Sequence, residues 1–231
     1  EIDKAKLKGK RQYVENEVEL LARCRHPNII RLINAYQSTN HYFVAMELLE
    51  NGDLFDSIKS NGSFSESVTA GVVYDVSCAL AYLHDNKVVH RDIKPENLLL
   101  TTDFRVKLAD FGLACKVMGP LYRVCGTPTY VAPEILAQKG YGIEVDIWSL
   151  GIITYIMLCG YAPFRHEDRQ KLFKKIKKGE LVFESKPWNK LSESCARFIR
   201  HVVVVKPRDR YTAAEVLKCR WVRRKRSSSF R

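Results

Sequence analysis

The stretch HRDIKPEN at positions 90–97 constrains this chain more than any other. It places Asp92, Lys94 and Asn97 in one proline-containing loop. Residues at i, i+2 and i+5 share no face of a regular helix, so these side chains converge only from a bent backbone. A second carboxylate, Asp110, comes on its own loop after a short apolar run. The loop thus supplies a proton acceptor, a cation and an amide oxygen, and Asp110 adds a second carboxylate. This combination indicates metal-assisted phosphoryl transfer.

The composition is that of an ordinary globular chain. With 231 residues, 46% of them apolar, it can bury one large core or two small ones. The net charge of +12 would suit nucleic acid or anionic lipid, but the basic residues cluster mainly at 171–178 and 220–226 without interleaved aromatic rings. We therefore expect a solvated basic face and no nucleic-acid partner. Binding through this face would have to weaken steeply with salt.

Seven cysteines are scattered through the chain with no C-x-x-C pair. This pattern argues against a zinc site or redox motif and favours free thiols in a reducing compartment. No secretory segment is present, and residue 1 is glutamate. We therefore expect a cytoplasmic chain that was cut from something longer or whose start is missing.

The run from Ile147 to Phe164 carries no charge and approaches the length of a membrane span. Two glycines and a proline interrupt it, and two acidic residues stand at its start. The centre of a large helical domain also requires a helix that is apolar on every side. The run therefore predicts a buried helix, and we expect no membrane span.

The first part of the chain mixes a helix with strands. Apolar residues recur at helical spacing over 14–23, which predicts an amphipathic helix. Two strands are predicted at 29–32 and 41–46, joined by a polar turn at 37–40, with a connector at 47–52.

Helices dominate the rest of the chain. A long helix over 68–83 is entered through Ser65, and short strands at 98–100 and 105–109 precede a loop that runs to position 134. Further helices are predicted from Asp146, near 168–178, near 192–203, and after a capping box at 212–215. This order predicts an α+β fold in which a small mixed lobe leads into a helical one.

Three motifs in order resemble the eukaryotic protein kinases: H-R-D-x-K-x-x-N at 90–97, D-F-G at 110–112 and A-P-E at 132–134. The segments 46–56 and 119–131 resemble the calcium/calmodulin-dependent group, and particularly the doublecortin-like kinases. The resemblance runs from residue 1 to about residue 222.

This resemblance implies a protein-kinase-like fold with ATP and Mg²⁺ as cofactors. Residues 1–49 would be the remnant of a truncated small lobe, with one helix and a few strands. Residues 50–222 would form a mainly α-helical large lobe, and 223–231 a basic tail.

The resemblance also assigns the catalytic roles. Asp92 would accept the proton of the substrate hydroxyl, and Lys94 would lie near the transferred phosphoryl group. Asn97 and Asp110 would bind Mg²⁺. Thr127, counted with the catalytic residues, points with Lys94 to serine or threonine as the phosphate acceptor.

The cofactor-binding positions implied by the resemblance are Glu47, Leu49, Asp53, Glu96 and Leu99. The backbone of Glu47 and Leu49 would meet adenine, with Leu99 beneath it. In relatives, acidic residues at the positions of Asp53 and Glu96 receive an arginine upstream of the phosphorylated residue. Protein substrates with basic residues upstream of serine or threonine are therefore expected.

Further residues have structural or regulatory roles by the same resemblance. Glu17 would pair with a lysine of the family's third strand, and Arg91 would receive a phosphate of the loop. Phe111 would stack in a hydrophobic spine with Leu21, Leu32 and His90.

Two more predictions concern side-chain contacts within the large lobe. Glu134 and Arg210 are expected to form a buried ion pair. Asp146 is expected to cap the central helix and to hold the backbone of the catalytic loop.

Two departures from the family pattern matter. The glycine-rich loop and the strand-three lysine are absent, because residues 1–10 resemble the segment directly after that lysine. Arg123 stands where many relatives carry a phosphorylatable threonine. The leading interpretation is a fragment of an active serine/threonine kinase, and the alternative is an inactive pseudokinase or scaffold. The intact Asp92, Asn97 and Asp110 favour an active parent.

In the tail at 223–231, serines follow arginines along the chain. Ser227 has Arg224 three residues upstream, and Ser229 has Arg226. Either serine is a candidate autophosphorylation site, against the alternative of a solvated charge run. The family resemblance also suggests association with the cytoskeleton.

Overall fold

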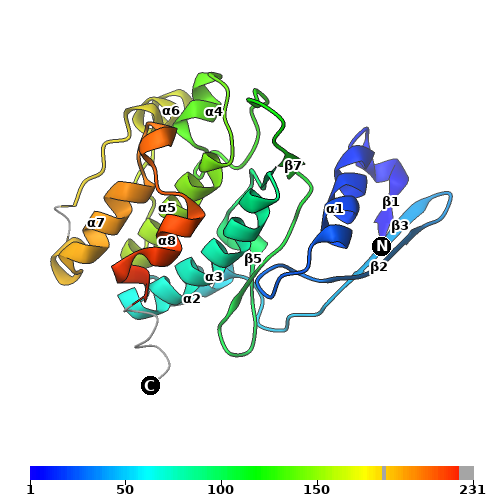
Figure 1. Ribbon diagram of the computed structural model, residues 1–231, viewed down its shortest axis with the longest axis horizontal. Helices are drawn as coiled ribbons and strands as arrows, with labels where there is room; N and C mark the ends of the chain where they lie inside the picture. The colour runs from blue at the N-terminus through cyan, green and yellow to red at the C-terminus, as the bar shows by residue number, and fades with distance from the viewer. Residues whose placement is uncertain (184–185, 224–231) are drawn as a thin grey trace.

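The computed structural model describes residues 1–183 and 186–223, which form two lobes (Figure 1). The small lobe combines one α-helix with a three-stranded sheet, at the right of Figure 1, and the large lobe is mainly helical. The chain after Asp110, drawn in green, passes between them. The predicted α+β architecture is confirmed.

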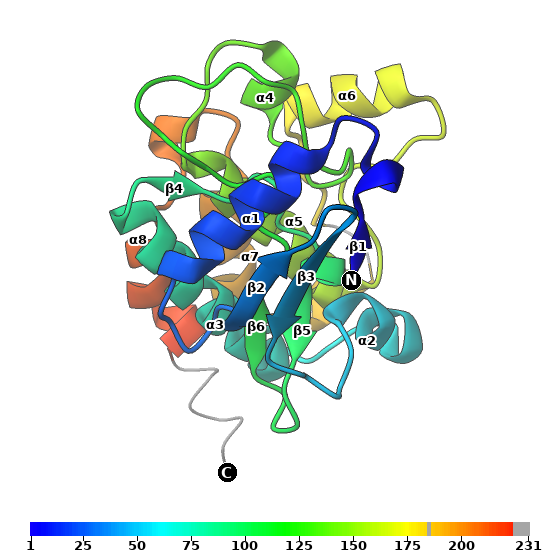
Figure 2. The same cartoon turned by 90° about the vertical axis from the view of Figure 1, so that its right-hand side faces the viewer.

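The sheet of the small lobe has the strand order β1-β3-β2 and is antiparallel. The elements of this lobe are β1 (Ile2–Asp3), η1 (Lys4–Leu7), α1 (Arg11–Arg23), β2 (Leu32–Gln37) and β3 (His41–Met46). The predicted amphipathic helix is α1, which buries Val14 and Leu21. Figure 2 shows α1 lying alongside the sheet.

The strand predicted at 29–32 is wrong, because β2 begins only at Leu32. Ile29 and Ile30 are buried beside the large lobe instead, and the Ile30 N–H donates a 2.9 Å hydrogen bond to the carbonyl oxygen of Leu108. A backbone paired in that way is not available to β3. The strand predicted at 41–46 is confirmed as β3.

The large lobe contains α2 (Leu54–Asn61), α3 (Glu66–Asp85), α4 (Pro133–Ala137), α5 (Glu144–Cys159), α6 (Arg169–Lys178), α7 (Glu193–Val202) and α8 (Ala213–Lys218), with single turns η2 (Pro95–Asn97), η3 (Trp188–Lys190) and η4 (Pro207–Asp209). Ser65 caps α3 by accepting a hydrogen bond from the Val68 N–H, as its position in the sequence indicates. Thr212 and Glu215 form the predicted capping box of α8.

The central helix α5 is buried along almost its whole length, with Glu144 and Ile156 as its more exposed residues. It packs closely on the end of α7, because a Cβ added at Gly151 would lie 2.6 Å from the Val203 side chain. Only glycine permits that approach. The predicted buried helix is thus confirmed, and none of the helices within 1–183 and 186–223 is long and apolar enough to cross a membrane.

Four short strands arrange the loops of the site: β4 (Val88–Val89), β5 (Leu98–Leu100), β6 (Val106–Leu108) and β7 (Cys115–Lys116). The antiparallel pairs are β5 with β6 and β4 with β7. Beyond the β5–β6 pair, the Ala109 N–H donates a 2.9 Å hydrogen bond to the Asn97 carbonyl oxygen. The two loops that carry the candidate chemistry are therefore joined through their backbones.

Candidate active site

Asp146 fixes the backbone of the catalytic loop, residues 90–97. Its Oδ2 accepts a hydrogen bond from the His90 N–H and its Oδ1 accepts one from the Arg91 N–H, each over 2.9 Å. Arg91 has a φ of 69°, a left-handed conformation that costs energy. The hydrogen bonds to Asp146 offset this cost and hold the backbone in that conformation. Burial alone would raise the pKa of Asp146, but the hydrogen bond and charge of His84 and the hydrogen bond from the His90 N–H hold that pKa below its ordinary value.

Asp146 therefore holds the loop backbone as predicted, but the prediction that it caps the central helix is wrong. α5 begins at Glu144 after Ile143, which places Asp146 inside the first turn. Its carboxylate is completely buried and lies 2.9 Å from Nε2 of His84. Both of its oxygens accept hydrogen bonds from the loop or contact this histidine, so Asp146 does not cap the helix.

His90 is enclosed between two backbone groups and an aromatic ring. Its Nε2 lies 3.1 Å from the Ala109 carbonyl oxygen, and the Asp92 N–H points to its Nδ1 over 3.4 Å. A neutral ring with the proton on Nε2 satisfies both contacts. Burial lowers the pKa of His90, because a charged ring would lose its water. The Phe111 ring meets it edge-on at 4.9 Å, while the other spine residues Leu21 and Leu32 are buried and half-buried.

Asp92 is the point at which the other candidate catalytic residues meet. Lys94 Nζ lies 2.8 Å from Asp92 Oδ2. The opposite oxygen, Oδ1, accepts hydrogen bonds from the Thr127 hydroxyl at 3.0 Å and from the Thr127 N–H at 3.2 Å. Asp92 itself is buried, and these partners contact both of its carboxylate oxygens. The structure thus brings the three predicted catalytic residues together.

Asn97 and Asp110 lie on two loops that the backbone bond from Ala109 to Asn97 joins. The amide nitrogen of Asn97 donates to the Asp92 carbonyl oxygen over 2.9 Å, which turns the amide oxygen away from that bond. Asp110 is exposed, has a φ of 59°, and accepts a 3.2 Å hydrogen bond from the Gly112 N–H. A carboxylate and an amide oxygen suit Mg²⁺. Across the described ranges, no three acidic, histidine or cysteine side chains gather at one metal position, so such an ion would need water or phosphate oxygens as well.

Helix α1 contacts the D-F-G loop through consecutive side chains. The Phe111 N–H donates to Glu17 Oε1 over 3.4 Å. Asn16 Nδ2 donates to the carbonyl oxygens of Phe111 at 3.3 Å and Ala114 at 2.7 Å. Burial and the nearby Asp110 charge raise the pKa of Glu17. α1 is therefore positioned against the loop that carries Asp110.

The residues expected near adenine lie at the junction of the lobes. The side chain of Glu47 pairs with Lys107 Nζ at 2.7 Å and accepts a hydrogen bond from the Arg31 N–H. Its carboxylate is thus held by Lys107 of β6 and by Arg31, which directly precedes β2. Leu49 and Leu99 are both half-buried.

The two acidic positions expected at the substrate side differ from each other. Asp53 caps α2, because its carboxylate accepts a 2.9 Å hydrogen bond from the Asp56 N–H. Glu96 is exposed. Burial alone would lower the pKa of Lys94, but its hydrogen bond to Asp92 and the nearby acidic charges, Glu96 among them, raise it. Glu96 is therefore the more accessible of the two acids.

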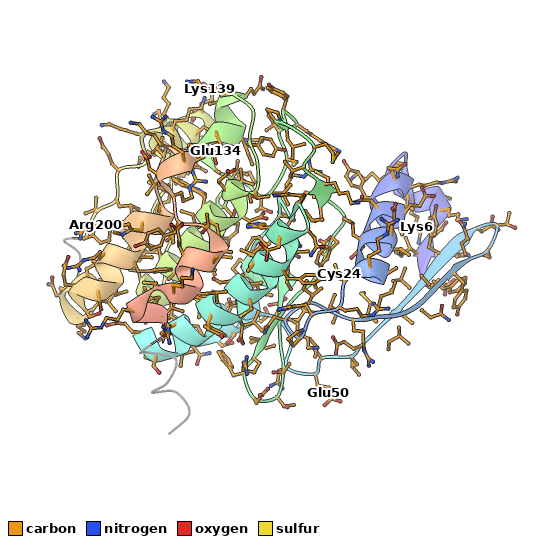
Figure 3. The ribbon with its side chains drawn as sticks, in the orientation of Figure 1. Lys6, Cys24, Glu50, Glu134, Lys139 and Arg200 are labelled. Carbon is orange, nitrogen blue, oxygen red and sulfur yellow. The ribbon has the colours of Figure 1, made fainter. Side chains whose placement is uncertain are left out.

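The predicted ion pair between Glu134 and Arg210 is present. Two parallel contacts join them, at 2.8 Å from NH1 to Oε1 and 3.1 Å from NH2 to Oε2. Both residues are buried, and Arg210 also donates to the carbonyl oxygens of Val204 and Glu144. Figure 3 places Glu134 at α4 in the helical part of the molecule. The pair ties the A-P-E segment to α5 and the following helices.

Several residues of the site carry no motif of their own. Asn16 is an ordinary helix residue in the sequence, and Tyr141 comes after the A-P-E helix without a recognisable pattern. Arg91 donates from Nε to the Leu113 carbonyl oxygen over 2.6 Å and from NH1 to the Tyr141 hydroxyl over 3.4 Å. The guanidinium expected to receive a phosphate is thus bonded to groups of the protein itself.

A buried loop aspartate beside a lysine, an asparagine and a second acidic loop defines the catalytic centre of a protein kinase. Over residues 1–222 the chain matches the protein kinase domain family, and it belongs to that family.

Among its relatives, serine/threonine-protein kinase DCLK2 of Rattus norvegicus is 48% identical over 227 residues, which cover 96% of this chain and 30% of that protein. Serine/threonine-protein kinase DCLK1 of Rattus norvegicus is 46% identical and is covered over 52% of its length. Calcium/calmodulin-dependent protein kinase type 1 of Macrobrachium nipponense is 45% identical and is covered over 65%. The predicted resemblance to the doublecortin-like kinases is confirmed, and the chain spans less than a third of the DCLK2 relative.

Proposed function

We propose that this chain supplies most of the catalytic domain of a serine/threonine protein kinase, which transfers the γ-phosphate of ATP to protein substrates. The observation that carries the proposal is the meeting of Lys94 and Thr127 on Asp92, with Asn97 bonded to the same aspartate. A purely structural domain has no need for these polar groups around one buried carboxylate.

Each residue then has a distinct task. Asp92 accepts the proton of the substrate hydroxyl, and Lys94 places a positive charge beside the phosphoryl group in transfer. Asn97 and Asp110 hold Mg²⁺, which neutralises phosphate charge when bound. Thr127 closes over Asp92 and keeps its Oδ1 oriented, which leaves Oδ2 to face Lys94 and the acceptor.

The junction of the lobes would receive the nucleotide. The backbone of Glu47 and Leu49 contacts adenine, and Leu99 lies below the ring. This proposal divides the chain into a small lobe at 1–49, a large lobe at 50–222 and a basic tail. The cysteines, none of which forms a disulfide among the described residues, support a cytoplasmic location, and the family resemblance supports an association with the cytoskeleton.

The substrate would be a peptide with arginine upstream of serine or threonine. The exposed Glu96 supports this preference, and the half-buried Asp53 adds a second negative charge at the start of α2. Ser227 and Ser229 lie outside the described residues. Their upstream arginines make them candidate autophosphorylation sites, which mass spectrometry after incubation with Mg-ATP would identify.

A transfer assay tests the proposal. A segment with the glycine-rich loop and strand-three lysine of the family pattern is fused before residue 1. The chimera is given radiolabelled Mg-ATP with matched peptides that carry serine, threonine or tyrosine as the phosphate acceptor. We expect label on serine and threonine only, and none with Asp92→Asn. Asp103→Asn, an exposed aspartate in the turn after β5, is the matched control and should leave transfer intact. Absence of transfer by the chimera would favour the alternative of a binding scaffold.

A further inference from the structure

Arg123 lies in the activation segment, residues 110–134, at a position where it makes a contact outside that segment. Its guanidinium lies over the Tyr13 ring of α1, 5.1 Å from the ring centroid, and its NH2 group also donates to the Tyr13 hydroxyl. A guanidinium over an aromatic face is attracted by the ring quadrupole. The activation segment is therefore joined to the first turns of α1 without any phosphate.

The backbone of Arg123 is held from the opposite side. The Tyr141 hydroxyl donates a 2.7 Å hydrogen bond to the Arg123 carbonyl oxygen and accepts a 3.4 Å bond from Arg91 NH1. Tyr141 is buried, and this burial raises its pKa to about 12, so the hydroxyl keeps its proton near neutral pH. Arg91 in turn is fixed to Leu113 and belongs to the catalytic loop.

Tyr13 also lies beside the loop that carries Asp110. A Cβ added at Gly112 would be 3.8 Å from the Tyr13 Cβ, so the two residues are close neighbours with room for no more than one such atom between them. One turn further along α1, Asn16 and Glu17 bond to Phe111. Movement of α1 at Tyr13 would therefore be transmitted to the D-F-G loop.

We propose that these contacts form a phosphate-independent tether that keeps α1 and the D-F-G loop in the arrangement needed for phosphoryl transfer. The members of the tether are Tyr13, Arg123, Tyr141 and Arg91. This inference rests on the proposed kinase function for its effect on activity, but the contact itself is testable without activity. Tyr13 and Arg123 act as positioning residues, since neither touches the reacting groups.

The first experiment measures amide hydrogen exchange on residues 1–231. Arg123→Ala should make the α1 amides exchange roughly threefold to tenfold faster, as expected for loss of one cation–π contact and one hydrogen bond. Tyr13→Phe keeps the ring and should give a smaller increase. The double variant should add little to Arg123→Ala, because both changes break one contact.

Arg165→Ala is the matched control, because Arg165 also lies over a tyrosine ring, that of Tyr161, at 4.6 Å. It should leave exchange in α1 unchanged. Amides of α8 serve as an internal reference for global unfolding in every variant. Equal α1 protection in wild type and Arg123→Ala would overturn the tether, and so would additive effects of the two changes.

The second experiment uses the chimera described above after full phosphatase treatment. Wild type should retain its transfer rate, whereas Arg123→Ala should lose roughly tenfold in kcat. Arg123→Thr should become dependent on phosphorylation of the new threonine. A wild-type rate that disappears with phosphatase would contradict the tether. A chimera with no transfer in any state would contradict the proposed function, while the exchange experiment would still decide whether the tether exists.

Discussion

Thr127 and Asp92 are joined twice, through the Thr127 hydroxyl at 3.0 Å and the Thr127 N–H at 3.2 Å, both to Asp92 Oδ1. The activation segment thus holds one oxygen of the aspartate that we assign as proton acceptor. The other oxygen faces Lys94 at 2.8 Å. Loss of the hydroxyl would leave the carboxylate less well oriented.

Thr127→Ala in the chimera should lower kcat by about 10-fold to 100-fold, because a hydrogen bond to a charged group contributes about 1.5–3 kcal/mol. Thr127→Ser keeps the hydroxyl and should retain most of the rate. Steady-state kinetics on one serine peptide compares the three proteins. Equal rates for the alanine and serine variants would show that the hydroxyl has no part in orienting Asp92.

The buried pair of Glu134 and Arg210 should stabilise the large lobe as a unit. Glu134→Ala leaves a buried guanidinium without its partner, and we expect the free energy of unfolding to fall by about 3–5 kcal/mol. Urea denaturation of residues 1–231 measures the change. Glu193→Ala, which breaks an exposed pair with Arg200, should change stability little. Similar effects of the two variants would contradict a special role for the buried pair.

His90 should make stability depend on pH in the acidic range. Burial lowers its pKa in the folded protein below the ordinary value of 6.5, so the unfolded chain binds the proton more readily. The contribution of the neutral His90 to the free energy of unfolding is complete above pH 6.5 and is lost as the pH falls below that value. The effect appears as the difference in unfolding free energy between wild type and His90→Phe from pH 7.5 down to about pH 5. A difference that stays constant over this range would mean that His90 does not titrate as described.

The arrangement of the candidate site could be predicted from the sequence because its residues belong to motifs with fixed spacing. Asp92, Lys94 and Asn97 share one loop, and a short hairpin is enough to bring Asp110 beside them. The buried helix α5 was equally predictable, since an uncharged run of its length is apolar on every side and must be buried.

Errors arose where contacts between distant segments decide the outcome. Ile29 and Ile30 have the composition of a strand, but their neighbours in space are Leu108 and the large lobe. The contacts of Tyr13 and Tyr141 have no local signal, because each depends on a residue of the activation segment far away in the sequence.

Residues 1–231 alone should bind ATP weakly. The apolar Met46 and Leu48 at the lobe junction are 41% and 82% exposed, which leaves the expected adenine site without cover. Fusing a segment with the glycine-rich loop and strand-three lysine of the family pattern before residue 1 should tighten ATP binding by about tenfold or more, since it adds contacts and preorganises the phosphates. Isothermal titration with Mg-ATP compares the two proteins. Equal affinities would show that the nucleotide site described here is complete without that segment.

The most direct measurement of the central claim compares Asp92→Asn with Asp110→Asn in the chimera. Nucleotide dissociation constants and single-turnover transfer rates are measured for both with Mg-ATP. If Asp92 acts on the acceptor hydroxyl, Asp92→Asn should reduce transfer by about 1,000-fold or more while the dissociation constant stays within about twofold. If Asp110 holds Mg²⁺, its variant should also weaken Mg-ATP binding. An Asp92→Asn protein that transfers phosphate normally, or whose main defect is weaker nucleotide binding, would contradict the assignment.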